Sequence, residues 1–287
     1  MIEQIKKIIE EHKGTLKKGD FMAADLRVSK FFHGNPSFNT KVLFLVFLHQ
    51  DPLCILKVAR SVDVNPLLER EIKGLEYFAH NNLKVPRMFF SGQINGLSFV
   101  CEEVLVGLPV GKKDESIWLP QVVSYHTSVK KIKIITIGTL LELFDGIDTP
   151  HDKEFMQTTV LLSQRVQREV WLAPQHGDVT SKNLIVHQGE VYFIDFENFN
   201  MRPVWGLDLV HYMTRLVNAH NEGRDVKETL AFFVSSVKKC KEYPLFGLSD
   251  GELEDLFLLD LFFEILQKNL FKRKAEILPL MEKIWSL

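Results

Sequence analysis

The sequence predicts an α+β protein, with a small antiparallel β-sheet and one helix in its first part and a larger, mainly helical second part. Between residues 21 and 101, short apolar runs rich in β-branched and aromatic residues alternate with turn-forming residues, which is typical of antiparallel strands. Beyond residue 113, apolar residues recur at three- and four-residue intervals, which is the period of a helix. The loop-like stretch Leu108 to Lys113 separates the two patterns. We therefore expect two units, residues 1–107 and residues 108–287.

The composition of the 287-residue chain is that of a globular protein, with 46% hydrophobic and 25% charged residues. The formal net charge is −2 and no long basic block occurs, so neither nucleic acid nor a membrane is an expected partner. The three cysteines, Cys54, Cys101 and Cys240, form no Cys-x-x-Cys pair, which indicates free thiols in a reducing compartment. No apolar run reaches membrane-spanning length and a charged helix opens the chain, so we expect a cytoplasmic protein.

The first part is expected to begin with an amphipathic helix over residues 1–12, where isoleucines recur at helical spacing. A second helix is predicted by the apolar stripe from Leu67 to Phe78. Lys57 lies in the middle of an apolar strand, where an unpaired charge would be costly to bury. Its expected partner is Glu71 on the second helix, with Glu69 as an alternative. The predicted strands span residues 21–32, 41–48, 53–58, 85–90 and 97–101.

The second part is expected to contain mostly helices around one β-hairpin. Residues 132–137 are rich enough in β-branched side chains to form a strand instead of a helix. The helical pattern covers residues 116–130, 132–144, 151–171, 207–217, 226–240, 251–271 and 275–284.

Residues 175–197 carry the strongest functional signal. Two short apolar runs, residues 183–186 and 191–194, flank turn-forming residues, which predicts a hairpin. Asp178 and Asn183 precede the first strand and Asp195 ends the second, so we expect their side chains at one end of the hairpin. Phosphoryl transfer needs such a group, because one carboxylate accepts the proton of the attacking hydroxyl while a carboxylate and an amide oxygen hold Mg²⁺. Read singly, each Asp could instead be a turn residue.

The pattern H-G-D-x-x-x-x-N followed by I-D-F-E resembles the aminoglycoside phosphotransferase and choline kinase family, which has a two-lobed, protein-kinase-like fold. The resemblance implies that Asp178 is the catalytic base and that Asn183 and Asp195 are the metal ligands. It also implies that Lys57 bridges the α- and β-phosphates of the nucleotide while Glu71 steadies it.

Two further segments are similar to parts of this family. Glu103 to Gly107 matches the E-x-x-x-G connector between the lobes, where the backbone at Glu103 and Leu105 would bind the adenine edge. The turn at residues 33–39 would cover the phosphates, but it holds a single glycine, Gly34, and a plain hairpin loop is an equal alternative.

Asp208 and the acidic residues of the last long helix each have two possible roles. Asp208 could brace the catalytic loop, as the resemblance implies, or cap a helix. The acidic residues of the last long helix could recognise a cationic substrate or form a solvated face. These residues are Asp250, Glu252, Glu254, Asp255, Asp260 and Glu264.

Together these features predict a Mg²⁺-dependent transfer of the γ-phosphoryl group of ATP or GTP to a hydroxyl of a small molecule, such as a sugar, an aminoglycoside or an amino alcohol. The rival from another class is a kinase-like module that binds nucleotide, or serves as a scaffold, without turnover. A protein kinase is disfavoured because no A-P-E segment follows Asp195. The histidines, among them His151, His187 and His211, lack metal-ligand spacing and are predicted to be surface or packed residues.

Overall fold

The computed structural model describes residues 1–16, 18–31, 41–111, 114–144, 153–219, 224–270 and 283–284. The chain folds into two compact units, residues 1–108 with 185–197 and residues 109–184 with 198–287. The observed boundary lies one residue after the expected one. Residues 185–197, which the expected division places in the second part, cluster with the first unit.

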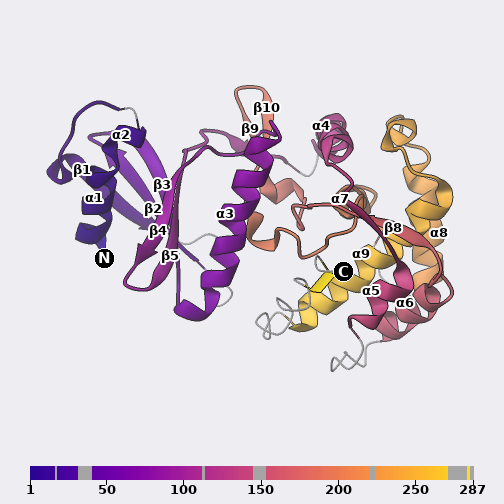
Figure 1. Cartoon of the computed structure of the whole chain (residues 1–287). Helices are drawn as coiled ribbons and strands as arrows, with labels where there is room; N and C mark the ends of the chain where they lie inside the picture. Colours follow the sequence, from indigo (N-terminus) through magenta and orange to yellow (C-terminus); the bar gives the residue numbers. More distant parts are fainter. Residues whose placement is uncertain are drawn as a thin grey trace. The chain divides into compact units, whose positions relative to one another are not determined.

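The first unit is built on an antiparallel sheet in the order β1-β2-β3-β5-β4, drawn in indigo to purple in Figure 1. Its strands are β1 (Leu26–Phe31), β2 (Lys41–Leu48), β3 (Asp51–Ala59), β4 (Met88–Ile94) and β5 (Leu97–Glu102). Its helices are α1 (Ile2–Glu11), α2 (Lys13–Leu16) and α3 (Asn65–His80). The predicted meander and the predicted helix after it are confirmed, but the first strand begins at Leu26 and not at residue 21, because Ala23–Asp25 form a 3₁₀ turn.

Alternate residues of β3 serve the two faces of this sheet, because successive side chains of a strand point in opposite directions. Leu56 is fully buried in an apolar core to which α1 contributes Ile5 and Ile9. Ile55 and Lys57 instead line a cleft. One face of β3 therefore packs in the apolar core, and the opposite face lines the cleft.

The predicted hairpin forms from β9 (Leu184–His187) and β10 (Glu190–Phe193), with β6 (Leu108–Pro109) as a third strand beside β9. Its two turn residues, Gln188 and Gly189, have positive φ angles of 52° and 80°. This is the backbone that a two-residue type I′ turn requires.

Two contacts attach the end of this hairpin to the first unit. The amide of Phe193 donates to the carbonyl of Lys84 at 2.9 Å. The fully buried Phe196 packs on Phe78 of α3, with ring centroids 5.2 Å apart. A Cβ added to Gly74 would come within 2.8 Å of the Phe196 side chain, so this position of α3 must lack one. Residues 185–197 join the first unit because their apolar side chains pack there.

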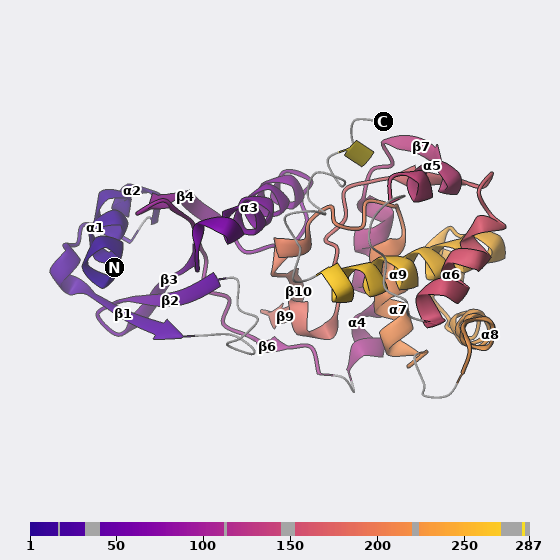
Figure 2. The ribbon, with the colours of Figure 1, turned by 90° about the horizontal axis from the view of Figure 1, so that it is seen from below.

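The second unit is mainly helical, as predicted, and its central element is α9 (Asp250–Leu270). This helix packs against α6 (Lys153–Ser163), α7 (Leu207–Leu216) and α8 (Val226–Val237), while α4 (Glu115–Ser128) packs on α7. Figure 2 shows α9 in yellow beside α6 and α7. Stacked aromatic rings fill the core, as between Phe155 and Phe262, whose centroids lie 5.4 Å apart.

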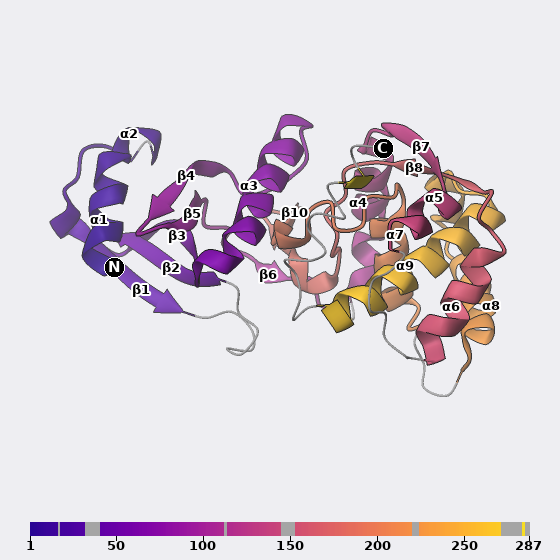
Figure 3. The ribbon, with the colours of Figure 1, turned by 60° about the horizontal axis from the view of Figure 1, so that its bottom comes forward.

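Two predicted helices of this unit are wrong in part. Within residues 132–144, β7 (Lys133–Thr136) precedes the short helix α5 (Ile137–Glu142), and within residues 151–171 the helix α6 ends at Ser163. The end of the latter range forms β8 (Glu169–Leu172), which pairs antiparallel with β7, as Figure 3 shows. The β-branched run at 132–137 was thus a strand signal, and pairing between distant segments decided its structure.

The phosphate-loop interpretation of residues 33–39 falls outside the described residues. So does most of the predicted helix 275–284, of which Lys283 and Ile284 are described and helical. None of the helices that the structure describes is both long and apolar enough to cross a membrane.

Candidate active site

The first unit contains a cleft of about 390 Å³ beside β3 and the β9–β10 hairpin, a volume in the range of small-molecule sites. Apolar side chains form much of its wall: Phe31, Leu43, Ile55, Pro86, Leu105, Ile185 and Ile194. Six ionisable residues line it as well: Lys41, Lys57, Glu102, Glu103, Asp195 and Glu197.

Lys57 has the partner that the sequence predicts. Its Nζ lies 2.5 Å from Oε1 of Glu71 and 2.8 Å from Oε2 of Glu102. The alternative partner, Glu69, instead accepts a hydrogen bond from the Ser98 hydroxyl at 3.2 Å. Burial opposes the charge on Lys57, but Glu102 and Glu71 outweigh it and raise the pKa of the ammonium. Lys57 is therefore a buried, charged group held in a fixed place.

A second lysine belongs to the same network. Nζ of Lys41 lies 2.7 Å from Oε2 of Glu71, 2.5 Å from Oδ1 of Asp195 and 3.7 Å from Oε2 of Glu197. Although burial opposes its charge, Asp195 and Glu71 raise the pKa of Lys41 well above its ordinary value. Glu71 thus holds one lysine on each of its two oxygens.

Glu102 contributes an unusual atom to the cleft. The residue is 2% exposed, and no described residue donates a hydrogen bond to its Oε1. Burial raises the pKa of this carboxyl group, while Lys57 acts in the opposite direction. A buried acceptor without a donor is costly, so a ligand N–H or O–H in the cleft would satisfy it.

Asp195 follows β10 in a left-handed backbone conformation, with φ of 67°. Asp is one of the few non-glycine residues that adopts this region, and such backbone is enriched at functional sites. The buried Phe196 directly after it anchors this turn on α3.

The connector residues both line the cleft. The amide of Glu103 donates to the carbonyl of Arg87 at 2.9 Å, so this amide is already engaged. Leu105 contributes to the apolar wall of the cleft.

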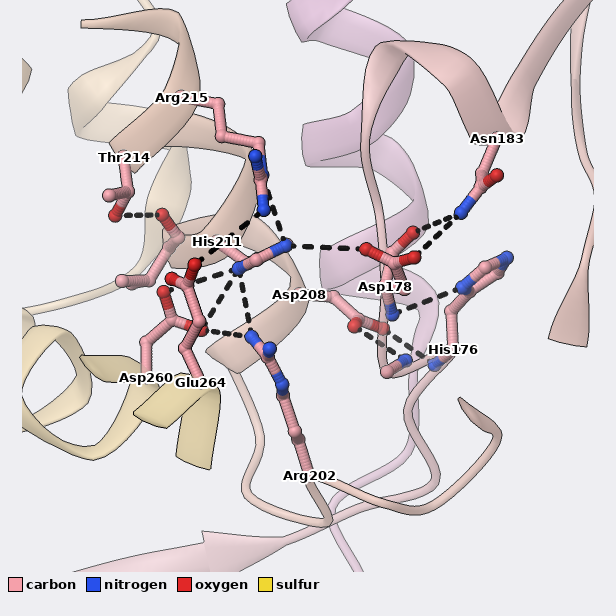
Figure 4. A network of polar contacts seen from close by, with 12 residues as sticks. His176, Asp178, Asn183, Arg202, Asp208, His211, Thr214, Arg215, Asp260 and Glu264 are labelled. Carbon is pink, nitrogen blue, oxygen red and sulfur yellow. Dashed lines mark hydrogen bonds and ion pairs between the residues drawn. The ribbon is translucent and has the colours of Figure 1, made fainter. Parts of the chain in front are cut away.

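In the second unit, Asp208 braces the loop that carries Asp178. Its Oδ2 accepts hydrogen bonds from the amide of His176 at 2.6 Å and from the hydroxyl of Tyr125 at 2.5 Å, and its Oδ1 accepts from the amide of Gly177 at 2.9 Å. Figure 4 shows these bonds to the loop. Asp208 is buried and makes no capping bond at the start of α7, so it has the bracing role and not the capping role.

Gly177 is required in this loop for two reasons. Its φ of 87° is a left-handed conformation, and a Cβ at this position would lie 2.0 Å from the carbonyl oxygen of Asn198. Only glycine meets both conditions without displacing backbone.

Asp178 and Asn183 are in direct contact. The side-chain amide of Asn183 donates to Oδ2 of Asp178 at 3.0 Å and to its carbonyl at 2.9 Å, which leaves Oδ1 of Asn183 as a possible metal ligand. The Asp178 side chain is 35% exposed, so it is accessible from solvent. Burial opposes its charge, but His211 and then Arg202 lower the pKa of Asp178 far below its usual range. The carboxylate is ionised at neutral pH.

A buried group of charged residues lies behind Asp178 (Figure 4). Nε2 of His211 is 3.4 Å from Oδ1 of Asp178, and Nδ1 is 3.2 Å from Oδ1 of Asp260. Arg202 Nη1 donates to Oδ1 of Asp260 at 2.5 Å. His211, Asp260 and Arg202 are each at most 3% exposed.

No protein-family model matches this sequence, and no curated protein matches it. Solved structures do. The macrolide 2′-phosphotransferase MphH from Brachybacterium faecium is 12% identical, with a TM-score of 0.56 over 96% of this chain and 93% of that one. A thermostable mutant of aminoglycoside phosphotransferase APH(4)-Ia is 14% identical, with a TM-score of 0.52 over 98% and 97%. The amicoumacin kinase hAmiN is 16% identical, with a TM-score of 0.51 over 98% and 95%.

The chain has the fold of the small-molecule phosphotransferases. The predicted fold class, an α+β chain of the protein-kinase-like type, is therefore confirmed.

Within this phosphotransferase fold, the structure brings Lys57 to Glu71 and Asp178 to Asn183. Asp195 belongs to the first unit, and Asp178 and Asn183 belong to the second.

Sequence reasoning missed several residues of these networks, among them Lys41, His211 and Glu102. Lys41 could have been found, because it lies two positions before Leu43, which pairs with Lys57 across the strands and shares its face. His211 follows Asp208 by three residues, one helical turn, and so shares its side of α7. No sequence feature identified Glu102 as a partner of Lys57.

The solvated-face interpretation of the last long helix is wrong for three of its acidic residues. Asp255, Asp260 and Glu264 are all buried. Asp255 pairs with Arg165 at 2.9 Å and with Arg168 at 2.8 Å, so this side of α9 carries internal ion pairs.

Proposed function

We propose that this chain is a Mg²⁺-dependent kinase that transfers the γ-phosphoryl group of ATP or GTP to a hydroxyl group of a small molecule. Sugars, aminoglycosides and amino alcohols are the acceptor classes to test. The observation that carries the proposal is the cleft in which the buried Lys57–Glu71 pair and Asp195 belong to one ionic network. Phosphoryl transfer requires fixed positive charge for the phosphates and a hard oxygen ligand for the metal.

The nucleotide is assigned to the cleft of the first unit. Solved structures with this fold support nucleotide binding, since hAmiN was solved in complex with AMP-PNP and Ca²⁺, and the APH(4)-Ia mutant with AMP-PNP and hygromycin B. In this chain the carbonyl of Glu103 and the backbone of Leu105 would bind the base, and Lys57 would bind the α- and β-phosphates. The acceptor atom Oε1 of Glu102 is positioned to receive a hydrogen bond from the ligand.

Lys41 is a second phosphate-binding candidate. Its ammonium pairs with Asp195 and Glu71. Phosphate oxygens would compete for this ammonium, because charge-assisted hydrogen bonds to phosphate are as strong as those to carboxylate. If the Lys41 ammonium moved from Asp195 to a phosphate, the Asp195 carboxylate could bind a cation.

Mg²⁺ would be held by Asp195 and by Oδ1 of Asn183. These residues fit the ion, because both offer hard oxygen atoms and the amide nitrogen of Asn183 already donates to Asp178. When bound, the ion would neutralise charge that develops on the phosphates.

Asp178 would act on the acceptor hydroxyl. The carboxylate is ionised and partly exposed, so it can accept the hydroxyl hydrogen bond and orient the oxygen for attack. The new bond joins that oxygen to the γ-phosphorus, and the bond from the γ-phosphorus to the bridging oxygen breaks. The hydroxyl proton passes to Asp178, and the nucleoside diphosphate leaves.

The proposal is tested by incubating the protein with ATP or GTP, Mg²⁺ and a panel of hydroxylated metabolites and antibiotics. Release of nucleoside diphosphate together with a phosphorylated acceptor in the mass spectrum is the expected result. Nucleotide binding without transfer to any acceptor would instead indicate the module without turnover.

A further inference from the structure

We propose that His211 is a positioning residue for Asp178, held from behind by Asp260 and Arg202 so that it fixes the orientation of the Asp178 carboxylate. The inference rests on the proposed function, in which Asp178 orients the acceptor hydroxyl. Its geometric basis lies entirely within the second unit and is drawn in Figure 4.

The two oxygens of Asp178 have different partners. Oδ2 accepts from the amide of Asn183 at 3.0 Å, and Oδ1 faces Nε2 of His211 at 3.4 Å. A carboxylate held on one oxygen can still rotate, whereas contacts on both oxygens fix its plane. Orientation matters here, because a displacement of about 1 Å in a reacting group can lower the rate by about 10²-fold.

The opposite nitrogen of His211 determines which proton faces Asp178. Nδ1 lies 2.8 Å from Nη1 of Arg202 and within 3.3 Å of both oxygens of Asp260. A neutral ring that accepts from Arg202 at Nδ1 carries its proton on Nε2, and a charged ring that donates to Asp260 also has a proton there. In both of these forms Nε2 has a hydrogen for Asp178, whereas a neutral ring that donates from Nδ1 to Asp260 would instead accept from Nε of Arg215 at Nε2.

The surrounding charges favour the protonated ring. Arg215 Nε also lies 3.3 Å from Nε2, and Arg215 Nη2 lies 3.8 Å from Glu264. Three carboxylates and two guanidinium groups therefore form the described charged surroundings of His211, and one positive charge on the ring balances them. These groups are Asp178, Asp260, Glu264, Arg202 and Arg215. Burial and Arg202 oppose the charge, but Asp260 and Asp178 outweigh them and raise the pKa of His211.

The same residues do not make a metal site. Ligand atoms of His211, Asp260 and Glu264 lie within 4.8 Å of one another, which alone would suit a cation. However, the guanidinium of Arg202 already donates to Asp260 at 2.5 Å and contacts Nδ1 of His211. Arg202 supplies the positive charge that a metal would bring, and it leaves His211 directed at Asp178.

Kinetics of two variants separate positioning from simple packing. His211→Leu removes the N–H that faces Asp178, and we expect kcat to fall by about 30- to 100-fold with little change in the KM for nucleotide. His211→Gln keeps a side-chain N–H at a similar reach, and we expect it to recover most of the loss. The matched control is His126→Leu, since His126 is as buried as His211 but bonds to the carbonyl of Phe246. The control should keep the wild-type kcat if it folds.

A titration followed by NMR tests the contact without any activity. We expect the pKa of His211 to fall by about 1 unit or more in Asp178→Asn, because the variant removes a nearby negative charge. An unchanged pKa of His211 in that variant, or wild-type kcat in His211→Leu, would overturn the inference. If the wild type phosphorylates no acceptor, the proposed function fails, and the titration still decides whether His211 holds Asp178.

Discussion

Lys41 of β2 and Asp195, two residues after the end of β10, form an ion pair with Nζ and Oδ1 2.5 Å apart. The pair joins a strand at the start of the chain to a segment 154 residues later. Its lysine also shares Glu71 with Lys57, so the two lysines and Asp195 are parts of one network.

Lys41→Met should weaken nucleotide binding and destabilise the fold. The change removes a candidate phosphate contact, so we expect the nucleotide Kd to rise by about 10- to 100-fold in calorimetric titrations. Breaking a largely buried ion pair should also lower the free energy of unfolding by about 3 kcal/mol in urea. Lys84→Met is the control, because Lys84 pairs with Glu190 on the surface. Equal nucleotide affinity in Lys41→Met and the wild type would remove Lys41 from the site.

Asp195→Ala should abolish the Mg²⁺ dependence of nucleotide binding, since the variant lacks the carboxylate assigned to the metal. Binding isotherms for ATP with and without Mg²⁺ measure this directly. If the variant binds the Mg²⁺ complex of the nucleotide as tightly as the wild type, Asp195 is not a metal ligand.

Gly177→Ala should destabilise the second unit. A side chain at this residue would have to adopt a φ of 87° and would meet the carbonyl of Asn198 at 2.0 Å, so we expect a loss of about 2–4 kcal/mol in the free energy of unfolding. Gly14→Ala is the matched control, because a Cβ there meets no atom within 4 Å. Equal unfolding midpoints for the two variants would show that the loop can adjust.

The ion pairs of His211 should make stability depend on pH. The pKa of His211 is raised in the folded state, so its protonation stabilises the fold fully below its unfolded pKa of about 6.5, and this contribution is lost as the pH rises through the folded value. The difference in free energy of unfolding between the wild type and His211→Gln should therefore be largest below about pH 6.5 and shrink above it. A difference that grows with pH would mean that the buried ring is neutral.

The sequence was sufficient where local pattern decides the structure. The meander, the α3 helix and the β9–β10 hairpin follow from apolar periodicity and turn residues, and the Lys57–Glu71 pair follows from the cost of burying a lone ammonium. Of the polar residues expected at one end of the hairpin, Asp178 and Asn183 are in contact, and their convergence with Asp195 stays a prediction.

What the sequence could not predict depends on how distant segments pack. β7 and β8 exist because they pair with each other, although residues 151–171 have a helical pattern throughout. Asp260 is buried because α9 presents it to His211 and Arg202, and no local feature of α9 identifies that side as internal. That no described residue donates to Oε1 of Glu102 likewise depends on which residues surround it in three dimensions.

The most direct test of the central claim is the activity of Asp178→Asn on an acceptor that the wild type phosphorylates. The base acts on the acceptor hydroxyl and not on the nucleotide, so we expect kcat to fall by about 10²–10⁴-fold while the nucleotide Kd stays that of the wild type. A variant that turns over at the wild-type rate would contradict the assignment of Asp178 as the base.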